Sequence, residues 1–236
     1  MATRLAALSA SVAQTLNWAP GSYSWRLIKR GLTNQVYSLK RGAEHVAFRI
    51  DRADAQALGI NRQAEITVHR AAWAAGFAPK ILLAGSGVFV TRWNTQPRWN
   101  AAHLLQAGRV RLLAETLSGL WSLDVDIPAR KLAELFPKDP ALHAFDALPC
   151  VVCHGDLNVN NLLGRDPLML IDFEFAARCS PAWDLAQLAA SQDLAPAQIA
   201  PLLGLLKLDL DPLALASLIA AARRLNAQWL AKVSAA

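Results

Sequence analysis

Apolar and polar residues alternate in short runs over much of the first hundred positions, which is typical of strands with one buried face. The alternation is clearest at Val46, Phe48 and Ile50, and a tight turn around Gly42 separates this run from the one before it. Five strands are predicted from these runs, over residues 25–30, 35–40, 44–50, 80–83 and 88–93. The first part of the chain is therefore expected to form a small antiparallel sheet.

Apolar residues recur every three or four positions in the remaining segments, which predicts helices. Gly76 and Pro79 end the predicted helix that begins near residue 61. The C-terminal helix is predicted to start with Asp211 as its N-cap and Pro212 at its first position. Beyond residue 98 one long stripe consists of Val110, Leu113, Leu117, Leu120 and Trp121. The other predicted helices cover residues 61–75, 129–135, 141–148 and 196–206. Strands first and helices afterwards indicate an α+β fold.

The N-terminal segment contains an apolar run that faintly resembles a signal peptide. Leu5, Leu8, Val12 and Leu16 fall at helical spacing, and polar residues interrupt the run, so an amphipathic helix is the better interpretation. No uninterrupted apolar run reaches the ~18 residues that a membrane-spanning helix needs. We therefore expect a cytoplasmic protein without a membrane partner.

The 236 residues are 54% hydrophobic, enough for a large core in one compact unit or two small lobes, and the net charge of +6 suits an anionic ligand. Lysine and arginine are scattered rather than clustered, which disfavours a nucleic-acid partner. The oligomeric state is left open.

Cys150, Cys153 and His154 match the C-x-x-C-H pattern of haem attachment, and Cys179 could complete a four-ligand zinc set. The export signal that haem attachment requires is not convincing, and the ligand spacing is poor for a zinc finger. Buried, reduced thiols are the favoured interpretation.

Four polar residues lie along a stretch with two short apolar runs, one ending at Val152 and one over residues 168–171, with Gly164 and Pro167 in the turn between them. Three of them come between the runs, and the fourth directly follows the second run. These four are His154, Asp156, Asn161 and Asp172. One carboxylate can orient a hydroxyl and accept its proton, while an amide oxygen and a second carboxylate are hard ligands for Mg²⁺. The residue types therefore point to phosphoryl transfer.

The segment CHGDLNVNNLL followed by LIDFEFA resembles the aminoglycoside phosphotransferase and choline kinase superfamily, and within it the choline/ethanolamine kinase and thiamine kinase branch most. The resemblance implies a protein-kinase-like two-lobed fold, with a nucleotide-binding lobe over residues 1–93 and a catalytic lobe over 94–236. It also implies ATP and Mg²⁺ as cofactors and a small-molecule alcohol as acceptor. By this resemblance Asp156 is the catalytic base, Asn161 and Asp172 hold Mg²⁺, and His154 and Asp184 support the loop.

The turn from Gly31 to Asn34 is similar to the family's G-G-x-T-N turn over the nucleotide phosphates, with Arg30 in place of the first glycine. The resemblance assigns nucleotide binding to Gly31, Thr33 and Asn34, and to Arg49 on the third strand. Glu65, on the helix over 61–75, is the expected partner of Arg49.

On that same helix, Arg62 competes for Glu65 in a surface pair, and Ile66, Trp73 and Ala74 are expected to face the core.

A protein kinase is disfavoured because little chain follows Asp172. Few acidic residues follow Arg178, which ranks polycationic aminoglycosides below choline, ethanolamine or thiamine; sugars stay open. Trp183 and Trp229 are the aromatic residues available after Phe175 for a quaternary ammonium group. A nucleotide-binding protein without catalysis is the competing class, although Asp156, Asn161 and Asp172 are all present.

Overall fold

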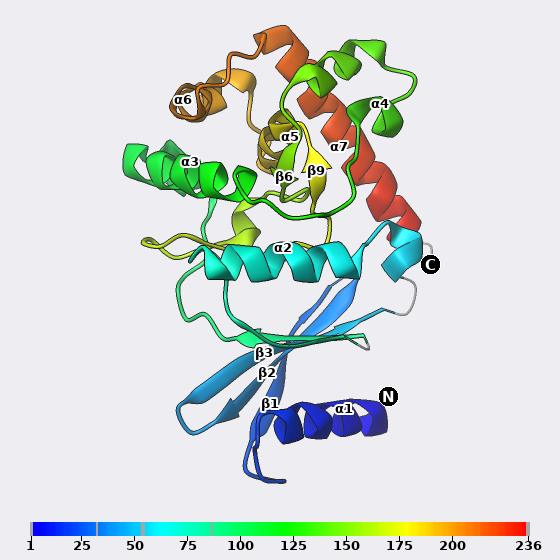
Figure 1. Ribbon diagram of the computed structural model, residues 1–236, viewed down its shortest axis with the longest axis vertical. Coiled ribbons are helices and arrows are strands. Elements are labelled where there is room, and N and C mark those ends of the chain that lie inside the picture. The colour runs from blue at the N-terminus through cyan, green and yellow to red at the C-terminus, as the bar shows by residue number, and fades with distance from the viewer. Residues whose placement is uncertain (1, 32, 53–54, 86, 235–236) are drawn as a thin grey trace. The chain divides into compact units, whose positions relative to one another are not determined.

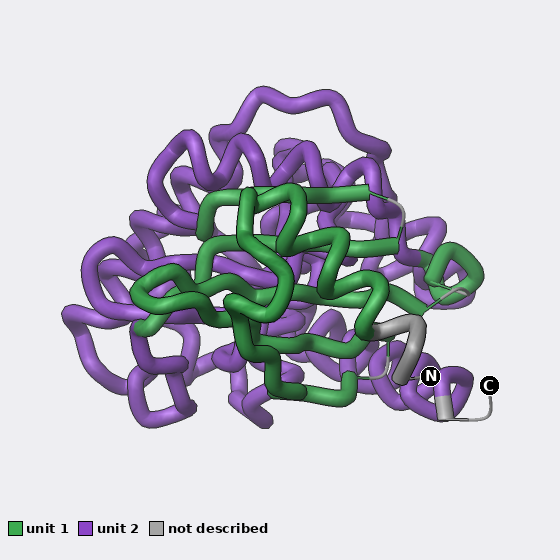
Figure 2. Tube along the Cα trace, turned by 90° about the horizontal axis from the view of Figure 1, so that it is seen from below, with its two compact units in different colours: residues 1–59, 79–95 green, residues 60–78, 96–236 purple. Residues whose placement is uncertain are grey.

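The computed structural model describes residues 2–31, 33–52, 55–85 and 87–234. They form two compact units, one of residues 1–59 and 79–95 and the other of residues 60–78 and 96–236 (Figure 2). The first contains an antiparallel sheet and the second is mainly helical, which confirms the predicted α+β fold. The predicted lobe boundary between residues 93 and 94 stays a prediction.

The first unit is built on a five-stranded antiparallel sheet with the strand order β1-β2-β3-β5-β4 (Figure 1). All five strands lie within two residues of their predicted ranges, and the clear alternation is in the second and third. Its elements are α1 (Ala2–Thr15), β1 (Ser24–Arg30), β2 (Asn34–Arg41), β3 (Glu44–Asp51), the 3-10 helix η1 (Ala55–Leu58), β4 (Ile81–Gly85) and β5 (Val88–Arg92).

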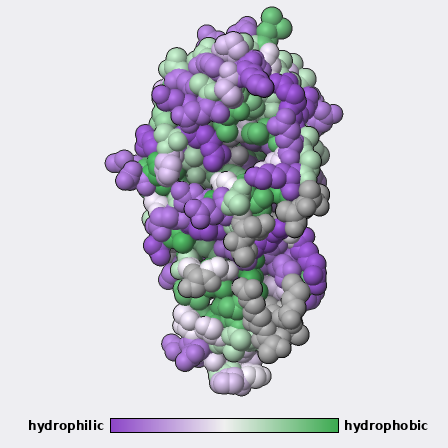
Figure 3. All heavy atoms as spheres, turned by 90° about the vertical axis from the view of Figure 1, so that its right-hand side faces the viewer, coloured by the Kyte–Doolittle hydropathy of each residue, from purple (hydrophilic) through white to green (hydrophobic). Residues whose placement is uncertain are grey.

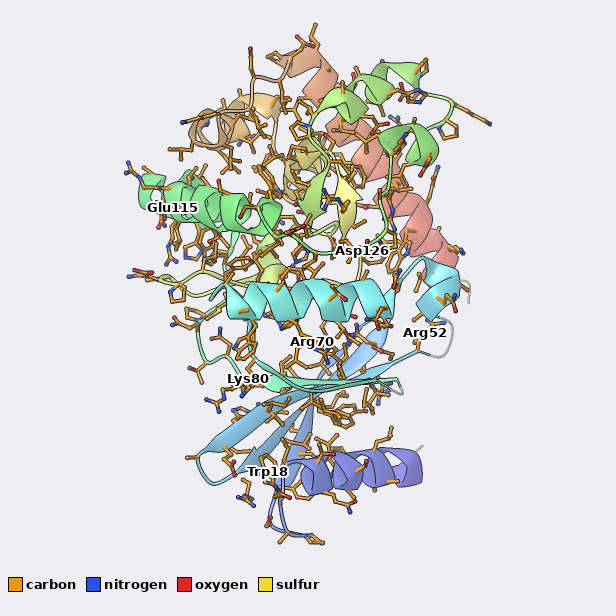
Figure 4. The ribbon with its side chains drawn as sticks, in the orientation of Figure 1. Trp18, Arg52, Arg70, Lys80, Glu115 and Asp126 are labelled. Atoms are coloured by element: carbon orange, nitrogen blue, oxygen red, sulfur yellow. The ribbon has the colours of Figure 1, made fainter. Side chains whose placement is uncertain are left out.

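The core of the first unit lies between α1 and one face of its sheet. Leu39 and Phe48, on neighbouring strands, are fully buried there, and Val12 of α1 packs against the same cluster. Alternate side chains of a strand share a face, so the period-two pattern places these apolar residues together. Trp18, just after α1, closes the cluster, and the Arg41 guanidinium lies 5.4 Å from its ring centroid (Figure 4). The predicted amphipathic N-terminal helix is confirmed.

The second unit contains the remaining helices and two short strand pairings, β6 with β9 and β7 with β8. Its helices are α2 (Arg62–Ala74), α3 (Ala107–Trp121), α4 (Leu132–Leu135), α5 (Pro181–Ser191), α6 (Pro196–Leu206) and α7 (Pro212–Ser234). Its short elements are η2 (Ala101–Leu105), η3 (Pro140–Ala147), η4 (Val159–Asn161), β6 (Val151–Cys153), β7 (Leu162–Leu163), β8 (Met169–Leu170) and β9 (Ala177–Cys179).

Helix α5 is the centre of the second unit's core, because nine of its eleven residues are buried. It packs against α7 and β6, and the apolar stripe of α3 is buried in the same cluster. Helix α7 begins as predicted, since the Asp211 carboxylate accepts a hydrogen bond from the Ala214 amide at 2.7 Å and Pro212 takes the first position. Proline at N1 has no N–H group that would be left without an intrahelical partner. An N-cap side chain that accepts a hydrogen bond from the first turn stabilises the start of a helix.

Several local predictions differ from the structure. The helix expected over 129–135 is reduced to α4, and the one over 141–148 is the 3-10 helix η3. On α2 the buried face contains Glu65 and Val68, whereas Trp73, expected inside, is 44% exposed, and Ala74 is exposed too. Which face of a helix is buried depends on what packs against it, and the sequence of α2 does not show which segments those will be.

Within the described ranges, every helix is too short or too polar to span a bilayer. On the face of the second unit visible in the upper part of Figure 3, hydrophilic side chains predominate and hydrophobic ones lie between them.

Candidate active site

The candidate catalytic residues lie on a loop and a hairpin of the second unit. Strand β6 pairs with β9, and the loop that follows β6 carries His154 and Asp156. Strands β7 and β8 form the hairpin, with Asn161 just before β7 and Asp172 just after β8. The sequence predicted the turn but not β7, nor that β6 would pair with β9.

The hairpin brings Asn161 and Asp172 to the same end. The Ile171 amide donates to the Asn161 carbonyl at 3.1 Å, which continues the β7–β8 pairing by one step. Asp172 is the next residue, with a φ of 69°. Asp adopts this left-handed conformation more readily than most residues, at a modest cost, and such conformations are concentrated at functional sites.

Asn161 also contacts the loop residue Asp156. Its Nδ2 donates to the Asp156 carbonyl at 3.0 Å and to Asp156 Oδ2 at 3.3 Å. Because Nδ2 is turned toward Asp156, the amide oxygen Oδ1 is directed away and is the atom available to a cation. Asn158, from the same loop, donates to the Asp156 carbonyl and accepts from the Asn160 amide, both at 3.0 Å, so its side chain caps the turn.

The surroundings of Asp156 favour its protonated form. Burial raises the pKa of Asp156 to about 6; nearby His154 opposes this, the Asp172 carboxylate adds to it, and hydrogen bonds from Asn158 and Asn161 oppose it. Removing a carboxylate from water penalises the charged form, and a second carboxylate nearby increases the penalty. A carboxyl group with a pKa near the operating pH is well suited to accept a proton.

His154 is engaged by backbone groups. It is fully buried, its Nε2 donates to the Ile171 carbonyl at 2.9 Å, and its Nδ1 accepts from the Asp156 amide at 3.4 Å. The ring lies 4.9 Å from that of Phe173, centroid to centroid. With both ring nitrogens directed at the backbone, His154 links the loop to the segment before Asp172.

Asp184 at the start of α5 holds the same loop. Its Oδ1 accepts from the Gly155 amide at 2.9 Å, and its Oδ2 accepts from the His154 amide at 3.0 Å and from Trp121 Nε1 at 3.1 Å. The side chain is fully buried. Three N–H donors around one buried carboxylate form charge-assisted hydrogen bonds, which are stronger than neutral ones.

Gly155, between His154 and Asp156, is required by the backbone. Its φ is +80°, and a Cβ atom there would lie 2.1 Å from the Phe175 carbonyl oxygen. No side chain fits at that distance, so the loop and the segment after Asp172 can approach this closely only because the residue is glycine.

Helix α2 is connected to the same segment by an ion-pair network. Arg62 Nη1 lies 2.7 Å from Glu65 Oε2 and 3.1 Å from Glu174 Oε2. The two glutamates are buried and Arg62 is partly exposed. Arg62 therefore does pair with Glu65, but in a buried network rather than the expected surface pair. The bridge to Glu174 has no signal in the sequence, because the two residues are far apart along the chain.

Of the predicted nucleotide-binding residues, Gly31, Thr33, Asn34 and Arg49 lie in the first unit and Glu65 in the second. The Gly31 amide donates to the Asn34 carbonyl at 2.8 Å, and Asn34 Nδ2 donates to Thr33 Oγ1 at 3.0 Å. Thr33 and Asn34 are buried, and Leu32 of this turn lies outside the described residues. The turn is thus closed by its own hydrogen bonds.

Arg49 on β3 is also buried. Its Nε lies 3.0 Å from Asp51 Oδ1, and its guanidinium lies 4.7 Å from the centroid of the Phe89 ring. The pairing of Arg49 with Glu65 of the second unit stays a prediction.

The cysteines do not support a haem or zinc site. Cys150 is exposed, contrary to the expectation of buried thiols, whereas Cys153 and Cys179 are buried as expected. Burial and the charge of Asp184 raise the pKa of Cys153 well above its usual range and that of Cys179 to about 12. Without a metal both therefore hold their protons, and no metal-holding group of three or more His, Cys, Asp or Glu is found in the described part of the chain.

The donor set at the hairpin fits Mg²⁺. Asn161 Oδ1 and the Asp172 carboxylate are hard oxygen donors at one end of the hairpin. Burial, and to a smaller extent the Asp172 carboxylate, raise the pKa of Asp156, and a nearby cation would offset both effects. Mg²⁺ commonly takes only one or two protein carboxylates and fills its other positions with water and substrate phosphates.

Residues 90–216 match the model of the Phosphotransferase enzyme family, which is more than half of the chain. None of the curated proteins compared with the chain matches it.

Solved structures show the same fold at low sequence identity. A choline/ethanolamine kinase family protein from Mesorhizobium loti is 19% identical with a TM-score of 0.67, covering 95% of this chain and 84% of that one. A macrolide 2′-phosphotransferase type I is 17% identical with a TM-score of 0.67 (96% and 95%). A spectinomycin phosphotransferase in complex with ADP and spectinomycin is 12% identical with a TM-score of 0.60 (87% and 81%).

Proposed function

The chain belongs to the phosphotransferase enzyme family, and from this membership we propose that it transfers the γ-phosphate of Mg·ATP to a hydroxyl group of a small molecule. The observation that carries the proposal is the arrangement of Asp156, Asn161 and Asp172, which one loop and one hairpin hold together. These are the residue types that phosphoryl transfer needs: one to orient the nucleophile and two to bind the metal.

In the proposed reaction, the acceptor hydroxyl donates a hydrogen bond to the Asp156 carboxylate. As the acceptor oxygen bonds to the γ-phosphorus, the bond to the β–γ bridging oxygen breaks and ADP leaves. The hydroxyl proton passes to Asp156, whose pKa of about 6 allows it to be ionised beforehand at neutral pH. Mg²⁺, when bound, neutralises the charge of the phosphate oxygens.

The other residues supply binding and positioning. Asn161 and Asp172 are the proposed metal ligands, and His154 and Asp184 fix the backbone around Asp156 through the hydrogen bonds described above. Gly31, Thr33, Asn34 and Arg49 of the first unit are the proposed nucleotide-binding residues, with Glu65 of the second as the proposed partner of Arg49.

We propose an acceptor of the choline, ethanolamine or thiamine type. Trp183 is almost fully buried against Phe136, so it cannot offer a face to a ligand. Phe175, next to the catalytic loop, makes an edge-to-face contact with Trp229 at 5.6 Å between centroids. An aromatic pair of this kind suits a cationic ammonium group. An aminoglycoside or sugar acceptor, or a nucleotide-binding protein without catalysis, are the alternatives that the assay separates.

The test is ADP release with Mg·ATP across choline, ethanolamine, thiamine, simple sugars and kanamycin. We expect one acceptor to stimulate the wild type, and Asp156→Ala to lower turnover by roughly 10²- to 10⁴-fold, the range of a lost general base. Asp126→Ala, which changes an exposed carboxylate in the loop after α3, is the matched control. Wild-type turnover in Asp156→Ala would refute the assignment.

A second measurement addresses the metal. We expect Asp172→Asn to lose Mg²⁺-dependent nucleotide binding in calorimetry, because the amide lacks the charge that holds the cation. Mg·ATP binding by the wild type with no turnover of any acceptor would favour the non-catalytic alternative. An unchanged Mg·ATP affinity in Asp172→Asn would contradict its role as a ligand.

A further inference from the structure

The turn of the β7–β8 hairpin is held from outside by two side chains of the second unit. Trp99 Nε1 and Arg109 Nη1 each donate a hydrogen bond of 2.7 Å to the carbonyl oxygen of Gly164. The Arg109 guanidinium lies 5.3 Å from the centroid of the Trp99 ring. Both donors therefore converge on one acceptor and contact each other.

The backbone around Trp99 reinforces the same attachment. The Gly164 amide donates to the Pro97 carbonyl at 2.9 Å, and the Trp99 amide donates to the Leu162 carbonyl at 2.9 Å. An isolated bridge between Arg98 and Leu163 lies between these bonds. Residues 97–99 thus act as a third strand along the outer side of β7.

The other side of the hairpin is attached as well. The Leu170 amide of β8 donates to the Phe77 carbonyl at 2.8 Å. An isolated two-stranded hairpin with strands of only two residues is not stable by itself. The geometry of its open end, where Asn161 and Asp172 lie, therefore depends on these outside contacts.

The surroundings of Arg109 make its charged form less favourable than it is in water. Burial, and next the charge of Arg165, lower the pKa of Arg109. The Trp99 side chain is 4% exposed, and a buried indole N–H needs a hydrogen-bond partner. The Gly164 carbonyl accepts a hydrogen bond from each of the two side chains.

We infer that Trp99 and Arg109 are positioning residues that set the separation of the two metal ligands, Asn161 and Asp172, by clamping the hairpin turn at Gly164. The inference rests on the proposed function, because it concerns the metal site of that reaction. Both side chains act through the hairpin and not by contact with a reacting atom.

Arg109→Met is the variant that tests the clamp with least disturbance, because it keeps an apolar stem against Trp99 and removes the donor. We expect its affinity for Mg·ATP to fall about tenfold, the equivalent of about 1.4 kcal/mol, whereas its affinity for ATP in EDTA stays unchanged. Arg109→Lys restores one donor and should recover part of the loss. Arg111→Met, at an exposed position of the same helix, is the matched control and should bind as the wild type does.

Hydrogen exchange gives a readout without nucleotide. In Arg109→Met, peptides covering residues 161–172 should exchange several-fold faster than in the wild type, whereas peptides from α5 should not change. Equal losses of affinity for ATP and Mg·ATP, or no loss of either, would overturn the inference. Failure of the wild type to bind Mg·ATP would refute the proposed function instead, and an unchanged exchange of the hairpin would then refute the clamp separately.

Discussion

Replacing Asp156 with asparagine should stabilise the metal-free protein at neutral pH while it removes activity. Asparagine keeps the shape of the side chain and an oxygen that can accept the hydrogen bond from Asn161. It removes the charge that the surroundings of Asp156 disfavour. The same substitution therefore separates the stability of the fold from the chemistry of the site.

The magnitude follows from the difference between the two states of the chain. The pKa of Asp156 is about 6 in the folded protein and about 3.9 in an unfolded chain. A gap of about 2 units corresponds to about 3 kcal/mol at 1.36 kcal/mol per unit. The side chain is only half-buried, and water screens part of this penalty. We therefore expect a gain of about 1 to 2 kcal/mol in the free energy of unfolding.

The difference in the free energy of unfolding between Asp156→Asn and the wild type depends on pH. Below pH 4 the carboxyl group is protonated in both states, so asparagine gains nothing. Between pH 4 and 6 the unfolded chain ionises first while the folded protein still holds its proton, so the free energy of unfolding of the wild type falls as pH rises. Above pH 6 the full penalty is present, and the variant's advantage should be constant.

Urea unfolding in EDTA, followed by tryptophan fluorescence at pH 4 and pH 7.5, measures this directly. Asp126→Asn is the control, because Asp126 is exposed in the loop after α3 (Figure 4) and asparagine should have little effect there. An advantage of Asp156→Asn that is the same at both pH values, or absent at pH 7.5, would refute the reasoning.

In the wild type, the same pKa predicts that kcat/KM falls as pH drops through about 6, because a protonated Asp156 cannot accept the proton.

Two further substitutions test the packing of the loop and the ion-pair network. Gly155→Ala should destabilise the protein by more than about 3 kcal/mol, or prevent folding, because its Cβ would collide with the Phe175 carbonyl. Thermal melts measure this effect. The control is Gly204→Ala in α6, which has open space around it and should be neutral or slightly stabilising. Arg62→Met should destabilise by about 2 to 3 kcal/mol in urea, because two buried carboxylates lose a shared cation. Arg70→Met, exposed on the same helix, should cost little, and equal losses in both arginine variants would contradict the role of the network.

The sheet and the catalytic residues could be predicted from the sequence because their signals are local. Strands β2 and β3 each bury apolar side chains on one face of the sheet, so their alternation is visible in short windows. His154, Asp156, Asn161 and Asp172 lie within a short stretch of chain, and one loop and one hairpin are enough to bring them together. Long helices such as α3 also show their period over several turns.

What the sequence could not reveal depends on contacts between distant segments. The bond from Trp121 to Asp184 and the two bonds to the Gly164 carbonyl join residues that no local pattern relates. Short helical segments such as α4 and η3 have little propensity of their own and take the form that their surroundings allow. For the same reason Trp73, apolar by type, is exposed: nothing in the sequence shows which neighbours α2 will have.

The unequal exposure of the three cysteines makes the chain suitable for labelling at a single position. Cys150 is exposed, whereas the thiols of Cys153 and Cys179 are buried and have raised pKa values, so they hold their protons. Alkylating reagents react with accessible thiolates, and a maleimide dye should therefore attach at Cys150 alone in the folded protein. Cys150 comes immediately before β6, and the loop of Asp156 follows that strand at its other end. Such a dye would therefore mark the second unit at one known position without any engineered residue.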